Sequence, residues 1–119
     1  MSTLAVGNWG EEIAARHLTQ RGWTIRDRKL RVGRIEVDLV AEKSDVLAFV
    51  EVKTRTGTGF GDSLSAIAPH KQRRLAEAAE KWLAGHGPLQ KPFRFDAIAV
   101  TGCPGRAVRV QHLENAWGI

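Results

Sequence analysis

The sequence contains a single cysteine, Cys103, and no long hydrophobic run. One cysteine cannot form a disulfide within the chain. The longest apolar stretches, at residues 46–50 and 97–100, are strand-sized and fall far short of the ~20 residues that cross a bilayer. The N-terminus also lacks the basic segment and apolar core of a secretory signal. We therefore expect a cytoplasmic protein that does not associate with membranes.

The sequence also lacks the residue patterns of two common kinds of catalytic site. Its histidines, at positions 17, 70, 86 and 112, are scattered without metal-ligand spacing, and one cysteine cannot build a zinc site. Cys103 lies in a turn rich in proline and glycine, far in sequence from any histidine that could activate it. These absences argue against zinc and against covalent nucleophilic catalysis.

The length and composition predict one compact domain spanning residues 1–119. Hydrophobic residues make up 43% of the chain and charged residues 26%, which is typical of a globular protein. Lysine and arginine outnumber aspartate and glutamate by 18 to 13, and the pI is near 10.0. This excess suits binding to the phosphates of nucleic acid. A basic surface that binds no specific anion would have the same composition.

The basic residues gather in two segments, at positions 26–34 and 71–74. Arg55, which follows the third predicted strand, can bind a phosphate through two parallel hydrogen bonds or can simply face solvent. The residues that we expect to contact a nucleic-acid backbone are Arg28, Arg31, Arg34, Arg55, Lys71 and Arg74.

Hydrophobic periodicity predicts helices over residues 9–21 and 69–84, and strands over 23–31, 35–42, 46–54, 93–101 and 107–112. Asn8 and Glu11 have the spacing of a capping box at the start of the first helix. Residues 56–62 form a glycine-rich loop in this prediction. The order α-β-β-β-α-β-β predicts an α/β fold, a mixed five-stranded sheet flanked by helices.

The third predicted strand carries the residues that suggest chemistry. Residues 47–53 are apolar on both faces except for Glu51 and Lys53, as expected for a strand in the middle of a sheet. Strand side chains alternate, so these two share a face. Burying an unpaired charge costs several kcal/mol, roughly, so both should have partners nearby.

The hairpin between the second and third strands supplies those partners. If its turn is centred just before Asp45, opposing residues have numbers that sum to 89. Asp38 then faces Glu51, and Glu36 faces Lys53, with Cβ atoms about 4.5–5.5 Å apart. A turn with an odd number of residues would break this register.

Opposed carboxylates repel each other unless a cation lies between them. Asp38, Glu51 and the carbonyl of Val52 are hard oxygen ligands that suit Mg²⁺ or Mn²⁺. Such an ion polarises a phosphoryl oxygen and activates water, and Lys53 could orient that water or stabilise charge on phosphorus. A purely structural network of ion pairs across the hairpin has the same spacing, so spacing alone leaves both interpretations open.

Asp38, followed after twelve residues by Glu51-Val52-Lys53, resembles the PD-(D/E)xK pattern of restriction-endonuclease-like proteins. The wider sequence resembles the YraN-like family, small bacterial proteins regarded as endonucleases and similar to archaeal Holliday junction resolvases. The segments that carry this resemblance are Gly7-x-x-Gly10-Glu11, residues 36–41, residues 49–55, Phe60-Gly61, Lys71 and residues 94–96. Two positions depart from the family pattern: Ile35 replaces a glycine, and Lys29 replaces an asparagine.

The resemblance implies a restriction-endonuclease-like core with Asp38, Glu51 and Lys53 as catalytic residues and Glu11 as a helix carboxylate of the same site. It implies Mg²⁺- or Mn²⁺-dependent hydrolysis of phosphodiester bonds, with DNA favoured over RNA and branched or distorted structures as candidate substrates. A homodimer would suit symmetric cleavage of a junction. It also favours a site role for Lys71, which would otherwise be an ordinary solvated lysine.

Other interpretations remain open from the sequence. Glu11 could serve only as a capping residue. Asp96 lies in an apolar strand and is expected to be the buried partner of an arginine rather than a catalyst. The whole chain could be a non-catalytic nucleic-acid-binding module with a nuclease-like fold, or an adaptor whose charged cluster satisfies itself.

Overall fold

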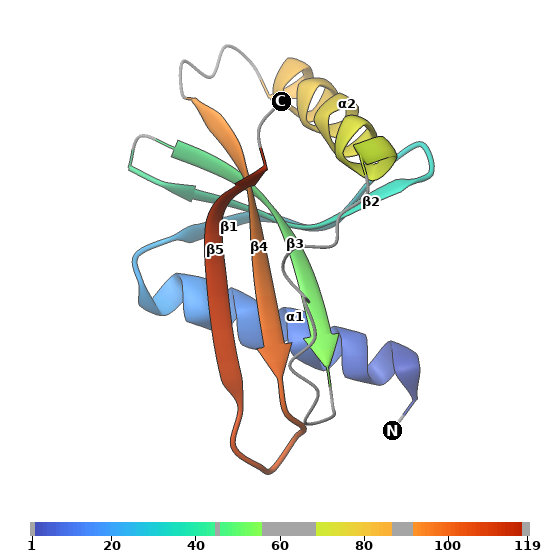
Figure 1. Cartoon of the computed structure of the whole chain (residues 1–119). Coiled ribbons are helices and arrows are strands. Elements are labelled where there is room, and N and C mark those ends of the chain that lie inside the picture. Colours follow the sequence, from blue (N-terminus) through green and yellow to red (C-terminus); the bar gives the residue numbers. More distant parts are fainter. Residues whose placement is uncertain (1, 45, 56–68, 87–91, 118–119) are drawn as a thin grey trace.

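The computed structural model describes residues 2–44, 46–55, 69–86 and 92–117. The elements are α1 (Thr3–Gln20), β1 (Thr24–Val32), β2 (Ile35–Lys43), β3 (Val46–Arg55), α2 (Pro69–Gly85), β4 (Phe93–Thr101) and β5 (Arg109–Trp117). The strands form one sheet in the order β1-β2-β3-β4-β5 (Figure 1). Only β3 and β4 pair in parallel, and the other neighbours are antiparallel. The predicted α/β fold with a mixed five-stranded sheet and this element order is confirmed.

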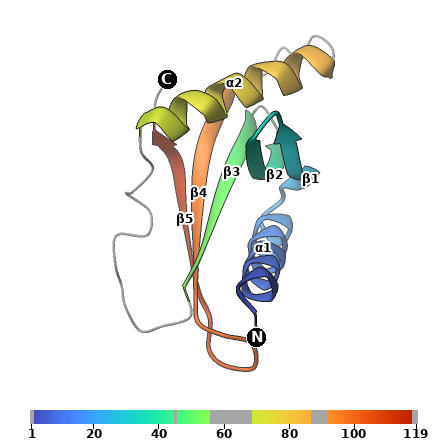
Figure 2. The same cartoon turned by 90° about the vertical axis from the view of Figure 1, so that its right-hand side faces the viewer.

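The two helices lie on opposite faces of the sheet, and Figure 2 shows α1 beside the strands and α2 across one end of them. Ala48 and Val50 pack on the α1 side, whereas Leu47 and Phe49 pack on the α2 side. The strand β3 is therefore buried on both faces, which explains its nearly continuous apolar sequence. Among the described residues, no helix combines the length and apolar character needed to cross a membrane.

The first helix begins earlier than its sequence predicts. It starts at Thr3, where the Ser2 hydroxyl accepts a hydrogen bond from the Ala5 amide at 3.1 Å. The prediction of a start at residue 9 with a capping box formed by Asn8 and Glu11 is wrong, because Ser2, six residues before Asn8, caps the helix. Glu11 lies inside the helix, so capping does not account for its side chain.

The remaining boundaries agree with the prediction more closely, and the fourth strand, residues 93–101, has the predicted bounds. The last strand runs from Arg109 to Trp117, longer than the predicted 107–112. It is an edge strand, and several of its residues after position 110 are polar. Hydrophobic periodicity therefore did not predict its full length. The glycine-rich segment 56–62 lies outside the described residues.

The register of β2 against β3 matches the hairpin arithmetic. The pairs from Leu39–Val50 to Lys43–Val46 all have numbers that sum to 89, so the predicted register is confirmed over this range. The described pairs end at Leu39. Val37 packs on the α2 side although Leu39 packs on the α1 side, and in a regular strand these two would share a face. The strand β2 therefore twists away from β3 around position 38.

Candidate functional site

Asp38 lies where β2 separates from β3. Its Oδ2 accepts a hydrogen bond from the backbone N–H of Val52 at 2.7 Å. This side chain thus satisfies an amide of β3 just beyond the last pair of the ladder, where β2 itself turns away. The twist of the hairpin and this hydrogen bond together fix the carboxylate at the junction of the two strands.

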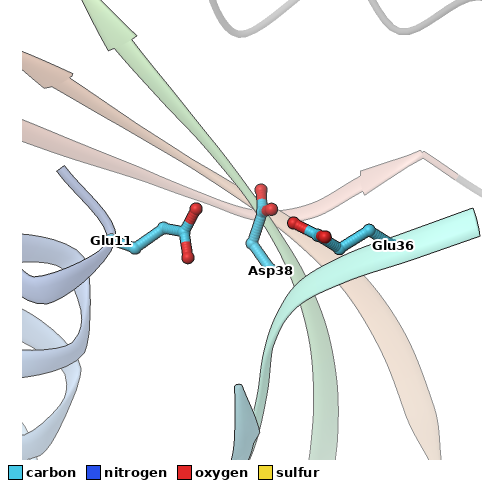
Figure 3. Close-up of side chains that lie close together, drawn as sticks. All are labelled: Glu11, Glu36 and Asp38. Atoms are coloured by element: carbon cyan, nitrogen blue, oxygen red, sulfur yellow. The ribbon is translucent and has the colours of Figure 1, made fainter. Parts of the chain in front are cut away.

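Two further carboxylates approach Asp38 from different elements. Glu11 reaches it from α1 and Glu36 from β2, as Figure 3 shows. One oxygen of each of the three residues lies within 4.8 Å of the other two. We call Glu11, Glu36 and Asp38 the carboxylate cluster. Three converging carboxylate oxygens are the donor set that hard divalent cations prefer.

The electrostatic setting of Asp38 is unfavourable for a carboxylate. Burial and the negative charge of Glu51, with smaller contributions from Glu11 and Glu36, raise the pKa of Asp38 to about 7, although the hydrogen bond from Val52 opposes them. Strongly perturbed carboxyl groups surrounded by like charge are typical of sites that bind a cation or transfer a proton.

Lys29 supplies a positive charge to the carboxylate cluster. Its Nζ donates hydrogen bonds to Glu11 at 2.9 Å and to Asn8 at 2.7 Å. The hydrogen bond to Glu11 is the main cause that raises the pKa of Lys29 above its usual value. Its backbone has φ of 49°, a left-handed conformation that costs on the order of 1–3 kcal/mol in a residue other than glycine. From this strained backbone, the Lys29 side chain extends to Asn8 and Glu11 on α1.

Sequence reasoning assigned no role in the site to Lys29. The pairs of β1 with β2 from Asp27–Val40 to Val32–Ile35 have numbers that sum to 67. This observed register sets position 29 opposite Asp38, whereas the predicted strands 23–31 and 35–42 centre the turn on Gly33 and would have set Arg28 there. Glu36 had been expected on this surface, but as the partner of Lys53 rather than as a member of the cluster.

A pocket of about 370 Å³ opens beside Asp38, between the β1–β2 hairpin and the start of α2. Asp38 and Glu51 both line it, so the structure brings these two predicted site residues to one surface from neighbouring strands. The residues that line the pocket are Arg34, Ile35, Glu36, Asp38, Glu51, His70, Lys71 and Arg74.

Glu51 pairs with a lysine from α2 rather than with one from its own strand. Lys71 Nζ lies 2.6 Å from Glu51 Oε1, and the Glu51 side chain is only 11% exposed. Lys53 is partly buried and is not among the pocket-lining residues. In the part of the chain that the structure describes, no ion pair or hydrogen bond occupies the Lys53 amine. The expected opposition of Lys53 and Glu36 is not formed, because the described pairs of β2 with β3 end before that point.

Val52 has a described role that differs from the expected one. Its carbonyl was expected to bind a metal ion, and the structure instead identifies its N–H as the donor to Asp38. The metal-binding role of the carbonyl stays a prediction.

Three of the six predicted phosphate-binding residues, Arg34, Lys71 and Arg74, line the pocket. Sequence reasoning missed a fourth basic group, His70, which is adjacent to Lys71 at the start of α2. Among the described residues, none forms an ion pair or hydrogen bond with the side chains of Arg34, His70 or Arg74. These groups are thus available to an anionic ligand.

The other three predicted phosphate-binding residues have contacts elsewhere. Arg28 forms an ion pair with Glu12 at 2.8 Å, and Arg31 forms one with Glu36 at 3.3 Å. Arg55 is exposed, and its guanidinium donates to the carbonyl of the preceding residue at 3.2 Å. The structure does not bring these three to the pocket.

Asp96 lies away from this pocket in a different environment. It is fully buried and accepts hydrogen bonds from the Arg94 guanidinium at 2.9 and 3.1 Å, from His112 at 2.7 Å and from the Asn115 amide at 2.9 Å. Burial alone would raise the pKa of Asp96, but these donors outweigh it and hold the pKa below its ordinary value. The prediction that Asp96 is the buried partner of an arginine is confirmed.

Comparisons with known proteins agree with the sequence resemblance at the level of family. A model of the family described as "Uncharacterised protein family UPF0102" matches residues 10–100. The chain is 42% identical over 113 residues to a UPF0102 protein of Frankia alni, covering 95% of this chain and 94% of that one. It is 44% identical over 113 residues to a UPF0102 protein of Anaeromyxobacter dehalogenans, covering 95% and 84%. A UPF0102 protein of Rhodococcus jostii is 42% identical over 114 residues, covering 96% and 97%.

Among solved structures, the chain is similar to Pyrococcus furiosus SfsA in complex with Ca²⁺, with 18% identity and a TM-score of 0.42. The match covers 95% of this chain but 64% of that one. A likeness of this degree carries no argument about the site. The names of the UPF0102 relatives describe no activity.

Proposed function

The chain belongs to the uncharacterised protein family UPF0102, and we propose that it is a divalent-metal-dependent endonuclease that hydrolyses phosphodiester bonds in DNA, with branched or distorted structures as its substrates. The observation that carries the proposal is the meeting of Glu11, Glu36 and Asp38 within 4.8 Å, beside a pocket lined by basic side chains that have no partner in the described part of the chain. Acidic groups for a cation and basic groups for phosphate thus occupy adjacent positions.

The residues present fit a Mg²⁺ or Mn²⁺ ion. All three members of the carboxylate cluster offer hard oxygen donors, and Glu51 lines the same pocket as Asp38. Burial and the repulsion of neighbouring carboxylates raise the pKa of Asp38, and a divalent cation relieves such repulsion. When bound, such an ion supplies Lewis-acid polarisation of a phosphoryl oxygen and a water of lowered pKa. We propose Asp38, Glu11 and Glu51 as ligands and add Glu36 to them.

The basic groups have distinct roles in this proposal. Lys53 has no partner among the described residues and lies two positions beyond Glu51 on the same strand, so its amine can orient water or stabilise charge on phosphorus. Arg34 and Arg74 hold the nucleic-acid backbone from the two walls of the pocket, which positions the substrate without reading its sequence. The amine of Lys71 pairs with Glu51, and in this proposal it also contacts a phosphate of the substrate.

One observation favours a non-catalytic second candidate, a nucleic-acid-binding module whose carboxylates pair within the chain instead of binding a cation. Glu51 already has Lys71 as a partner, and Glu11 already has Lys29. Carboxylates that bind no cation would form such ion pairs within the chain. Asp38 has no cationic partner of this kind among the described residues, and this difference supports the enzyme.

A substrate panel separates these candidates. Linear, nicked and four-way DNA, together with matched RNA, are incubated with Mg²⁺, with Mn²⁺ and with EDTA. We expect metal-dependent cleavage that falls by at least about a hundredfold in Asp38→Asn and in Lys53→Ala. Lys81→Ala, an exposed lysine on α2, is the control and is expected to cleave normally. Binding without cleavage on every substrate would support the module, and absence of binding at low salt would contradict both candidates.

A further inference from the structure

The helix α1 approaches β3 very closely at Gly10. A Cβ atom added to this buried glycine would lie 1.9 Å from Oγ1 of Thr54 and 2.9 Å from both its Cβ and its Cγ2. Side-chain carbons do not approach other atoms this closely. The backbone of the helix therefore rests directly on the Thr54 side chain, and only glycine fits at position 10.

Rotation of the Thr54 side chain cannot make room for a larger residue. Threonine is branched at Cβ, so turning one branch away brings another branch or the Cβ itself toward the helix. Even the most favourable rotation leaves the 2.9 Å contact with Cβ. Because carbon atoms normally pack about 3.5–4.0 Å apart, an alanine at position 10 requires the helix and the strand to separate by about 0.6–1.1 Å.

Glu11 follows Gly10 in the helix and is the one residue of α1 in the carboxylate cluster. The next acidic residue, Glu12, forms its ion pair with Arg28 instead. Lys29 also holds Glu11, but its long flexible side chain can follow a moving helix. The contact of Gly10 with Thr54 is a contact of the helix backbone, so it determines how far the helix stands from the sheet.

We propose that the close contact between Gly10 and Thr54 sets the reach of Glu11 into the carboxylate cluster, so that both are positioning residues of the cation site. This inference rests on the proposed function, because it assumes that the cluster binds a cation. Metal coordination tolerates ligand displacements of only about 0.2 Å, so a helix shifted by several tenths of an ångström removes Glu11 as an effective ligand.

The same helix offers a matched control. Gly7 lies about one turn earlier, and a Cβ added there would meet nothing within 4 Å. A Gly7→Ala substitution makes the same chemical change in the same helix without pressing on β3. Any difference between Gly7→Ala and Gly10→Ala therefore reports the contact with Thr54 rather than the helix propensity of alanine.

Mn²⁺ affinity of the purified full-length chain, measured by titration calorimetry, tests the proposal. We expect Gly10→Ala and Glu11→Gln each to weaken Mn²⁺ binding by at least about tenfold, and Gly7→Ala to change it less than about twofold. The double variant Gly10→Ala/Glu11→Gln should bind no more weakly than Glu11→Gln, because both changes remove the same ligand. Adding Thr54→Gly to Gly10→Ala clears all three close atoms and should restore the affinity of Thr54→Gly alone.

A folded Gly10→Ala protein with the affinity of the unsubstituted chain overturns the proposal, as does an additive loss in the double variant. If Gly10→Ala does not fold, Thr54→Val presses on the helix more mildly from the strand side. It should weaken Mn²⁺ binding several-fold, and an unchanged affinity overturns the proposal.

A metal-free readout separates failure of this inference from failure of the proposed function. In crystals of Gly10→Ala grown with EDTA, the nearest Glu11 oxygen should lie measurably farther from Asp38 and Glu36 than in the unsubstituted chain, where the three oxygens lie within 4.8 Å of one another. An unmoved Glu11 overturns the positioning role whether or not the chain binds Mn²⁺. Absence of Mn²⁺ binding by the unsubstituted chain would contradict the proposed function alone.

Discussion

Two aspartates in one sheet, Asp38 on β2 and Asp96 on β4, show that the neighbours of a buried carboxyl group decide in which direction its pKa moves. Asp96 is completely buried, yet its pKa lies below the ordinary value. Asp38 is only partly buried, yet its pKa is raised to about 7. Burial raises the pKa of both, so the opposite outcomes come from what surrounds each group.

The neighbours of Asp96 are hydrogen-bond donors from Arg94, His112 and the Asn115 amide. They satisfy it completely within the chain, as expected of a structural network. Asp38 has a single described hydrogen-bond donor, the amide of Val52, and carboxylates around it. In the proposed site, a bound cation would balance this negative charge. The contrast is between a carboxylate whose partners lie within the fold and one that we propose binds a cation.

The largest expected effect is on the Asp96 network. Asp96→Asn should lower the free energy of unfolding by about 3–5 kcal/mol at neutral pH, because it leaves Arg94 and His112 without their buried counter-ion. Since the folded pKa is lowered, the stability that Asp96 contributes is present above its ordinary pKa and is lost as pH falls through the folded value. Urea unfolding measures the change, and a loss below about 1 kcal/mol would contradict the account.

The same substitution at Asp38 should have the opposite sign. In metal-free protein, Asp38→Asn should raise the free energy of unfolding by about 1–3 kcal/mol near pH 8. The unfolded chain loses this proton near its ordinary pKa, whereas the folded chain holds it until about pH 7. The unsubstituted protein therefore loses stability as pH rises between these values, and the gain from the substitution should vanish near pH 4. Destabilisation at pH 8, or a gain independent of pH, would contradict the prediction.

The smallest expected effects concern the basic residues. Arg34→Ala and Arg74→Ala should each weaken DNA binding about three- to tenfold at low salt and lower the slope of log affinity against log salt by about one unit. Arg28→Ala is the comparison, since its guanidinium is already paired with Glu12, and it should have a smaller effect. Fluorescence anisotropy across a salt series measures all three. Equal losses at the three positions would show that the pocket has no special role in binding.

Local patterns predicted most of the fold because each depends on neighbouring residues alone. The apolar run within residues 93–101 led to the correct bounds of that strand, and the turn at residues 43–45 led to the correct register of β2 against β3. The predicted start of α1 was wrong because serine and asparagine are equally favourable N-cap residues, so Ser2 and Asn8 both fit the start of a helix. Choosing between them requires knowing that Asn8 contacts Lys29, a residue on another element.

The family resemblance placed Glu11 at the candidate site, but strand geometry predicted the site only where the regular sheet continues. Asp38 and Glu51 were expected to share a surface, and they line one pocket. The separation of β2 from β3 at Asp38 is a tertiary feature, so the regular register misplaced Glu36 opposite Lys53. The positive φ of Lys29 and the pairing of Arg28 with α1 likewise depend on how the elements pack, which periodicity does not reveal.

Carboxyl ¹³C NMR titration, run on one sample with EDTA and on another with saturating Mg²⁺, observes both aspartates together. We expect Asp38 to titrate near pH 7 without metal and at least about one pH unit lower with Mg²⁺, while Asp96 is unchanged. An Asp38 resonance that titrates identically in both samples, or near pH 4 without metal, would contradict the assignment of the carboxylate cluster as a cation site.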